Sequence, residues 1–88
     1  MTWRIEVKPS AEKQYLKIDA ATRRRIKTVL RELEGSEQPF LHPRVRALTG
    51  QLKGDFRVRV GGWRILLTPD HGSKVLFVYA ILPRGDAY

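Results

Sequence analysis

The sequence predicts a single α+β domain in which two helices pack on one face of a small, mainly antiparallel sheet. Local patterns follow the order β-α-α-β-β-β along the 88 residues. The last three predicted strands are joined by short turns, and strands connected in this way must be antiparallel. The predicted helices carry apolar stripes, which one face of a sheet can cover. The length leaves room for one domain, residues 1–88.

The first half of the chain predicts one strand and a helical hairpin. Residues 2–7 alternate apolar and polar side chains, which is typical of a half-buried strand. Pro9 ends this strand and opens a first helix. Asp19 is the predicted N-cap of a second helix over residues 20–34, and Gly35 is its stop. The apolar stripe of the second helix consists of Ile26, Val29, Leu30 and Leu33.

The second half predicts a loop followed by three strands. Residues 36–47 contain two prolines and no clear period, so a loop is expected there. Strands follow at about 55–60, 63–68 and 74–82, with the turn PDHGS between the last two. The run VLFVYAIL is continuously apolar, which predicts a strand covered on much of both faces.

The segment DFRVRVGGWRILL predicts a β-hairpin with an unusual concentration of arginines. The pair Gly61-Gly62 between alternating strands indicates a two-residue turn. Counting outward from that turn pairs Val60 with Trp63, Arg59 with Arg64, Val58 with Ile65, and Arg57 with Leu66. Alternation then places Arg57, Arg59 and Arg64 together on the face away from the core.

Like charges placed opposite each other are destabilising, so this face needs an explanation. Exposed arginines can splay into water, where salt screens the repulsion. The alternative is a bound anion, because the planar guanidinium makes paired hydrogen bonds to phosphate. The hairpin by itself does not decide between the two.

The overall charge favours a polyanionic partner. Seventeen Lys and Arg against nine Asp and Glu give a net charge of +8, which attracts nucleic acid, anionic lipid or an acidic protein. The chain has no cysteine, which excludes disulfides and thiolate metal sites. No apolar run approaches the roughly 18 residues of a membrane span, and the N-terminus lacks a signal-peptide pattern. We therefore expect a soluble cytoplasmic protein.

The C-terminal segment ILPRGDAY adds a cation and an aromatic ring after the last predicted strand. Arg84 leaves that strand, and Tyr88 ends the chain four residues later. Tyrosine can stack on a base or move a proton, so both residues could join the arginine face. A frayed terminus is the alternative interpretation.

The sequence resembles the RelE/ParE superfamily of bacterial and archaeal toxin–antitoxin toxins over nearly the whole chain. The resemblance is carried by the element order, by LTGQLKGDFRVRVGGWRILL, and by RGDAY after the last strand. The ending, an arginine followed by a tyrosine four residues later, points to the RelE branch. That branch comprises ribonucleases that cut messenger RNA on the ribosome.

The resemblance implies a reaction without metal or other cofactor. In it the 2′-hydroxyl attacks the adjacent phosphate and leaves a 2′,3′-cyclic phosphate and a 5′-hydroxyl. The implied catalytic residues are Arg64, which binds the phosphate, Arg84, which steadies the reacting phosphate or leaving group, and Tyr88, which stacks on a base and assists proton transfer. Arg57, Arg59 and Lys53 are the implied phosphate-binding residues.

Two departures from the family pattern affect the proton chemistry. Arg57 and Arg59 occupy positions that are often lysine, and arginine stays protonated below about pH 12. Leu82-Pro83 stands where relatives often have Gly and then His or Lys. The base is then Tyr88, with its pKa lowered by nearby cations, or a group of the ribosomal RNA or substrate.

Three functions therefore remain open from the sequence. The first is a RelE-type messenger-RNA endonuclease, with the cognate antitoxin, translated messenger RNA and ribosomal RNA as partners, and operator DNA through the antitoxin complex. The second is a ParE-type poison of DNA gyrase. The third is a decayed homologue that only binds its antitoxin. Arg23, Arg24 and Arg25 on the second helix are interpreted as a solvated face that could also touch ribosomal RNA or the antitoxin.

Overall fold

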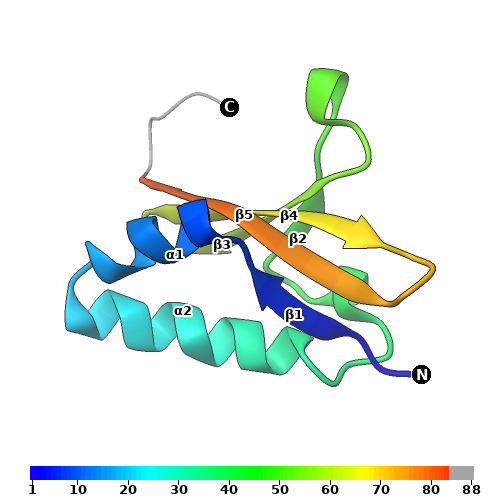
Figure 1. Ribbon diagram of the computed structural model, residues 1–88, viewed down its shortest axis with the longest axis horizontal. Helices are drawn as coiled ribbons and strands as arrows, with labels where there is room; N and C mark the ends of the chain where they lie inside the picture. The colour runs from blue at the N-terminus through cyan, green and yellow to red at the C-terminus, as the bar shows by residue number, and fades with distance from the viewer. Residues whose placement is uncertain (84–88) are drawn as a thin grey trace.

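A computed structural model describes residues 1–83 of the chain, and its fold is the predicted α+β arrangement (Figure 1). The two α-helices are α1 (Pro9–Leu16) and α2 (Ala20–Leu33). The strands are β1 (Arg4–Val7), β2 (Val45–Ala47), β3 (Phe56–Val60), β4 (Trp63–Asp70) and β5 (Val75–Pro83). Two short 3-10 helices, η1 (Pro39–Leu41) and η2 (Gly50–Leu52), flank β2.

The five described strands form one sheet in the order β1-β5-β4-β3-β2. Strand β1 runs parallel to β5, and the other three pairings are antiparallel. Helix α2 lies beneath this sheet in Figure 1, and α1 contacts β5. The helices therefore cover one face of the sheet. Neither α1 nor α2 covers the opposite face of β3, β4 and β5, which we call the open face.

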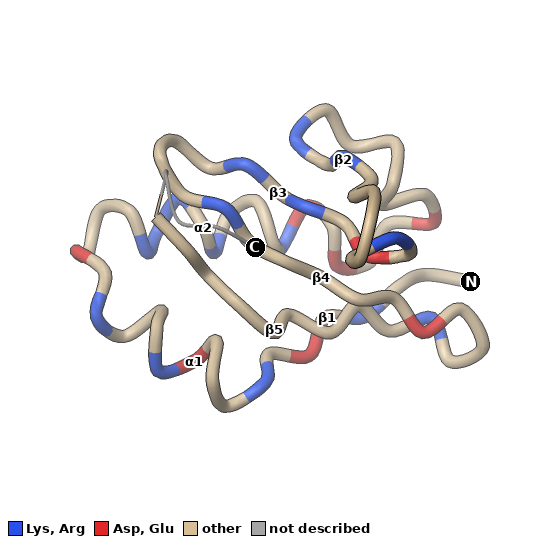
Figure 2. The backbone as a smooth tube through the Cα atoms, turned by 90° about the horizontal axis from the view of Figure 1, so that it is seen from above, with Lys and Arg blue, Asp and Glu red and all other residues tan. Residues whose placement is uncertain are grey.

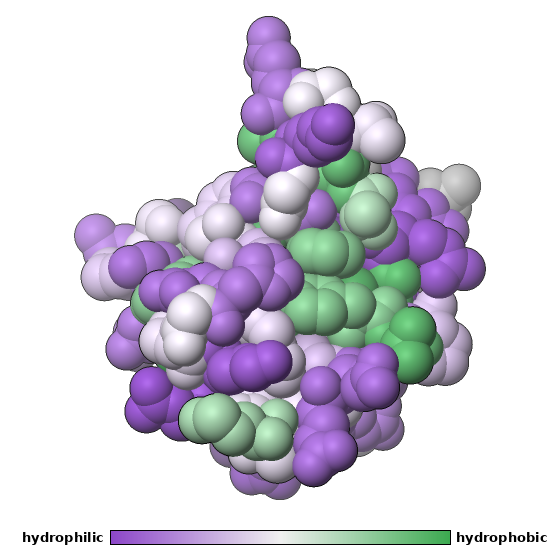
Figure 3. Space-filling model, turned by 90° about the vertical axis from the view of Figure 1, so that its right-hand side faces the viewer, coloured by the Kyte–Doolittle hydropathy of each residue, from purple (hydrophilic) through white to green (hydrophobic). Residues whose placement is uncertain are grey.

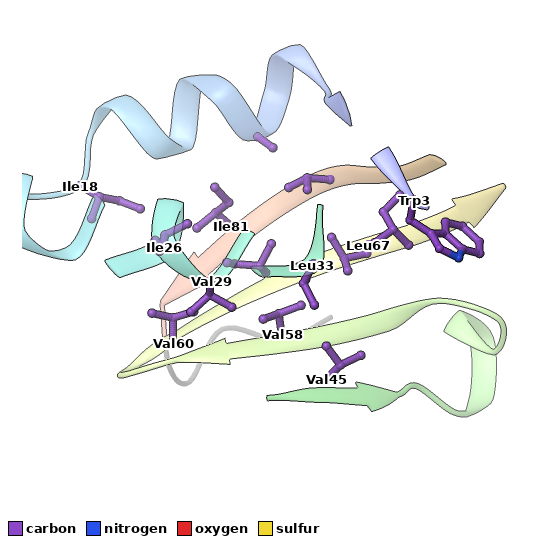
Figure 4. Close-up of a cluster of buried hydrophobic side chains, with 14 residues drawn as sticks. Trp3, Ile18, Ile26, Val29, Leu33, Val45, Val58, Val60, Leu67 and Ile81 are labelled. Atoms are coloured by element: carbon purple, nitrogen blue, oxygen red, sulfur yellow. The ribbon is translucent and has the colours of Figure 1, made fainter. Parts of the chain in front are cut away.

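The hydrophobic core lies between α2 and the covered face of the sheet (Figure 4). Ile26 and Leu33 on α2 are fully buried against Val58, Ile65 and their neighbours on the strands. Burying a side chain of this size stabilises the fold by about 1.5–3 kcal/mol relative to leaving it in water. Helix α2 begins at the predicted N-cap, where the Asp19 carboxylate accepts a 2.9 Å hydrogen bond from the backbone N–H of Thr22.

Two local predictions were wrong. Residues 36–47 are not only a loop, because they contain η1 and the edge strand β2, which pairs with β3 through Val45↔Val58. The predicted turn PDHGS begins later, since β4 continues to Asp70. There the Asp70 side chain accepts hydrogen bonds from the N–H groups of Gly72 and Ser73 and closes the turn to β5.

Aromatic rings close the end of the molecule near the N-terminus. Trp3 is 3% exposed and makes an edge contact with Phe40, whose ring lies 4.4 Å from that of Phe56. His71 is exposed but also packs edge-on to Trp3. Figure 3 shows this end, where apolar surface is bordered by hydrophilic side chains. Within residues 1–83, no helix has the length and apolar character needed to cross a membrane.

Candidate active site

The β3–β4 hairpin has the register predicted from its sequence. Arg59 lies opposite Arg64, and Val58 lies opposite Ile65. Of the two turn residues, only Gly61 has a positive φ, +58°. This is typical of a type II′ turn, whose backbone twist matches that of the flanking strands. The turn thereby sets which side chains share a face.

Three arginines of this hairpin project from the open face of the sheet. Val58, Val60 and Ile65 point into the core and are at most 2% exposed, so the alternate residues Arg57, Arg59 and Arg64 lie on the other side. Arg59 is exposed, whereas Arg57 and Arg64 are half-buried. Figure 2 looks onto this face and shows basic residues along β3 and β4, while β5 carries none. The predicted arginine face is therefore present.

Strand β2 extends this face with an arginine that was not predicted to belong to it. Arg46 pairs with Arg57, so its side chain lies on the same face. Its guanidinium is held by backbone carbonyl oxygens of Pro43 and Val45, at 3.3 and 3.1 Å. The alternation of Val45, Arg46 and Ala47 was the available signal, but three residues between prolines and glycines are too few to indicate a strand.

The arginine face, defined here as Arg46, Arg57, Arg59 and Arg64, borders several hollows, and two of them are each lined by at least two of these arginines. One has a volume of about 220 Å³ and is lined by Pro43, Arg44, Arg46, Arg57 and Arg59. The other, about 90 Å³, lies at the turn and is lined by Arg59, Gly61, Gly62, Trp63 and Arg64. Arg59 lines both hollows, which places them side by side. Guanidiniums around such a concave surface suit an anion with several oxygen atoms.

Of the other predicted site residues, the structure describes Lys53, which is not brought to these hollows. Lys53 is exposed at the end of η2 and lines neither of them. Arg84 and Tyr88 lie outside the described residues, so their assigned roles stay predictions. Residues 1–83 also contain no group of three His, Cys, Asp or Glu side chains placed to hold a metal ion.

A tyrosine–aspartate pair borders the arginine face and was not predicted. The Tyr79 hydroxyl on β5 donates a 2.7 Å hydrogen bond to Oδ2 of Asp55, which directly precedes β3. Because β4 lies between these strands, the Tyr79 side chain crosses β4 on the open side. Val78 is buried in the core, so alternation along β5 places Tyr79 on the open side. A register shift at Leu66/Leu67 leaves Tyr79 without a paired residue on β4. Burial, followed by the hydrogen bond and negative charge of Asp55, raises the pKa of Tyr79.

The arginine face can therefore bind and neutralise an anion but offers no free proton acceptor of its own. Its arginines stay protonated at physiological pH. The carboxylate of Asp55, which borders the face, already accepts a hydrogen bond from the Tyr79 hydroxyl. The raised pKa of Tyr79 keeps that phenol protonated and unsuited to act as a base near neutral pH.

Comparison with known protein families shows which family this chain belongs to. The family described as the ParE toxin of type II toxin–antitoxin systems, parDE, matches residues 5–88. The chain belongs to this toxin family. It is thus a member of the RelE/ParE superfamily of type II toxins, as its sequence indicated. No curated protein sequence matches it.

Solved structures of related toxins share the fold over nearly the whole chain. The archaeal RelE–RelB complex from Pyrococcus horikoshii matches this toxin with 27% identity and a TM-score of 0.79, covering 99% of this chain and 100% of that chain. A mutant of the E. coli toxin RelE in the free state matches with 19% identity and a TM-score of 0.76, covering 98% and 86%. The YoeB/ParE toxin from Agrobacterium tumefaciens matches with 17% identity and a TM-score of 0.74, covering 92% and 98%.

Proposed function

We propose that this toxin is a metal-independent endoribonuclease that cuts translated messenger RNA on the ribosome until its antitoxin neutralises it. The observation that carries the proposal is the arginine face, on which Arg59 opposes Arg64 and Arg57 opposes Arg46. Like charges that face each other across a sheet repel. A phosphate bound among these guanidiniums would offset that repulsion and accept paired hydrogen bonds from them.

The proposed chemistry uses these cations to stabilise charge that develops at the scissile phosphate. As the 2′-hydroxyl attacks, the pentacoordinate state carries two negative charges on its oxygens. Arg64 and Arg59 border the hollow at the turn and would donate hydrogen bonds to those oxygens. Groups positioned in this way contribute about 3–4 kcal/mol each to lowering a barrier. Arg84 would steady the leaving 5′-oxygen, and Tyr88 would stack on a base and assist proton transfer.

The partners follow from this proposal. The messenger RNA would be presented in the ribosomal decoding region, and ribosomal RNA would contact the remaining basic surface. The Pyrococcus horikoshii relative was solved as a complex of RelE with RelB, which supports a cognate antitoxin as partner here. Operator DNA would be contacted through that toxin–antitoxin complex. All of these partners are cytoplasmic.

Poisoning of DNA gyrase is the second candidate function, because the matching family is named for ParE. The ParE and RelE toxins share a scaffold, and the arginine face could contact DNA-bound gyrase instead of RNA. A catalytically decayed toxin is the third candidate. Its supporting observation is that no described residue of the arginine face can accept a proton at neutral pH.

Induction of the toxin in growing bacteria, with mapping of RNA 5′ ends, separates these candidates. We expect cuts within codons, only on translated messages, and a loss of about 10²–10³ in cutting rate for Arg64→Gln. Arg31→Gln is the matched control. Arg31 is exposed on α2, and replacing it by glutamine removes the same single positive charge. Intact messages with linearised plasmid DNA would support gyrase poisoning. Growth without arrest would support the decayed toxin.

A further inference from the structure

Another basic hollow lies on the other side of the β3–β4 turn from the arginine face. It has a volume of about 490 Å³ and lies between α2, which lines it from Ala21 to Glu32, and the end of β3. Its basic residues are Arg24 and Arg25 on α2 and Arg44 before β2, and Val60 and Gly61 form part of its wall. We call this hollow the α2 cleft.

The three guanidiniums of the α2 cleft are placed where an anionic ligand can reach them. The Arg25 guanidinium lies against the turn, where a Cβ added to Gly61 would come within 3.4 Å of its Nη2. Arg44 Nη1 donates a 3.3 Å hydrogen bond to the carbonyl oxygen of Arg59, which holds the side chain beside β3. Within residues 1–83, none of Arg24, Arg25 and Arg44 forms an ion pair.

Among the described residues, Glu32 and Asp19 are the acidic groups near the α2 cleft. Glu32 lines the cleft, and its Oε1 lies 2.8 Å from Nε2 of His42. Asp19 precedes α2, and hydrogen bonds from Thr22 and, to a smaller extent, the charge of Arg25 lower the pKa of its carboxyl group. Three arginines against these two carboxylates still leave an excess of positive charge, which favours an anionic ligand.

Arg44 connects the α2 cleft to the arginine face. It lines the α2 cleft together with Val60 and Gly61, and it also lines the 220 Å³ hollow together with Arg57 and Arg59. The basic surface therefore continues from α2, past the edge of β3, to the proposed phosphate site. A continuous track of this kind matches a chain of phosphates better than a single small anion.

We propose that the α2 cleft binds a backbone phosphate of the RNA strand whose scissile phosphate lies on the arginine face. The choice of RNA as ligand rests on the proposed function. Arg24 and Arg25 hold the distal phosphate, and Arg44 lies between the two sites. The cleft thereby adds affinity and fixes the direction of the strand without taking part in bond cleavage.

Two double variants of α2 with equal charge test the proposal. Arg24→Gln/Arg25→Gln removes two cations from the α2 cleft, and Lys27→Gln/Arg31→Gln removes two exposed cations of the same helix that do not line it. Both lower the net charge from +8 to +6. Glutamine has nearly the same helix propensity as lysine and arginine, so both variants should fold. Arg44→Gln provides a third variant outside the helix.

The measurement is the affinity for a short fluorescein-labelled polyuridine strand, followed by anisotropy over a salt series. The proposed cleavage requires the ribosome, so the free strand stays intact. Each phosphate contact contributes about −0.7 to the slope of log K against log salt for single strands. We expect Arg24→Gln/Arg25→Gln to make the slope shallower by about 0.7–1.4 and to weaken binding about fivefold at low salt. Arg44→Gln should act in the same direction, and the control variant should change the slope by less than half as much.

Several outcomes would overturn the proposal. Equal losses in the two double variants would indicate a general effect of net charge. An unchanged slope would mean that no phosphate binds in the α2 cleft. A loss of affinity for the antitoxin with unchanged RNA binding would make the cleft a protein-binding site. A wild-type toxin that binds RNA through the cleft but leaves translated messages intact would instead refute the proposed function alone.

Discussion

Replacing Tyr79 by phenylalanine is expected to destabilise the toxin at neutral pH, and the loss should shrink in alkali. The change removes the hydroxyl that donates a 2.7 Å hydrogen bond to the Asp55 carboxylate across β4. Hydrogen bonds to charged groups contribute about 1.5–3 kcal/mol to stability. Because both residues are only half-buried, we expect a loss near the lower end, about 1.5 kcal/mol at pH 7.

The pH dependence follows from the direction of the pKa change. Burial and the contact with Asp55 raise the pKa of Tyr79 in the folded toxin, whereas a phenol in the unfolded chain titrates near pH 10. A raised pKa stabilises the fold fully below the unfolded value, and this contribution is lost as pH rises toward the folded value. Above about pH 10 the wild type therefore loses up to about 1.4 kcal/mol per pH unit through this group. Tyr79→Phe has no such loss, so the two stabilities converge.

Urea unfolding followed by circular dichroism, at about pH 7, 9 and 11, measures both effects. Tyr79→Phe, Asp55→Ala and the double variant are compared with wild type, so that the titration of the other groups cancels. The double variant should be about 1 kcal/mol more stable than the sum of the single losses predicts, because both single changes break the same bond. Equal stability of wild type and Tyr79→Phe at pH 7 would refute this reasoning. So would a difference that stays constant or widens in alkali.

Two further substitutions test the turn and the helix start. Gly61→Ala should lower the free energy of unfolding in urea by about 1–2 kcal/mol, because alanine is strained at a φ of +58°. Gly62→Ala is the control, because Gly62 has no positive φ and a Cβ added there would meet no atom within 4 Å. It should be neutral or slightly stabilising. Equal losses at both positions would show that the turn is not of the type described. Asp19→Ala should lower the urea midpoint at pH 7, because it removes the N-cap of α2. Hydrogen bonds from Thr22 hold the pKa of Asp19 below its usual range, so the capping contribution is present above about pH 4 and is lost as pH falls through the lowered pKa. The midpoints of the two proteins should therefore approach each other in acid, and a difference that does not change between about pH 5 and pH 2 would contradict this account.

Much of the arginine face could be predicted because it depends on local rules. A two-residue turn leaves one register for the hairpin, and alternation then assigns each side chain to a face. The pairing of Arg59 with Arg64 is therefore confirmed residue by residue. The membership of Arg46 could not be predicted in this way. It depends on β2, which is only three residues long and forms because β3 offers it an edge.

Tyr79 shows a different limit of sequence reasoning. In the sequence it is one member of a continuous apolar run, and the run predicts a buried strand without distinguishing its residues. Alternation from the buried Val78 places Tyr79 on the open face, where the Asp55 carboxylate accepts a hydrogen bond from its hydroxyl. Asp55 lies 24 residues earlier in the chain and on the far side of β4, so the sequence of β5 alone does not indicate it as the partner.

The sequence by itself determined the α+β class, the helical hairpin, the hairpin register and the excess of positive charge on one face. These features follow from periodicity, turn length and composition, which are properties of neighbouring residues. Only the tertiary structure decided that β1 joins β5 in parallel, that Arg46 completes the arginine face, and that Arg44 links this face to the α2 cleft. Each of these arrangements brings together segments far apart in the chain, and their meeting depends on how the whole core packs.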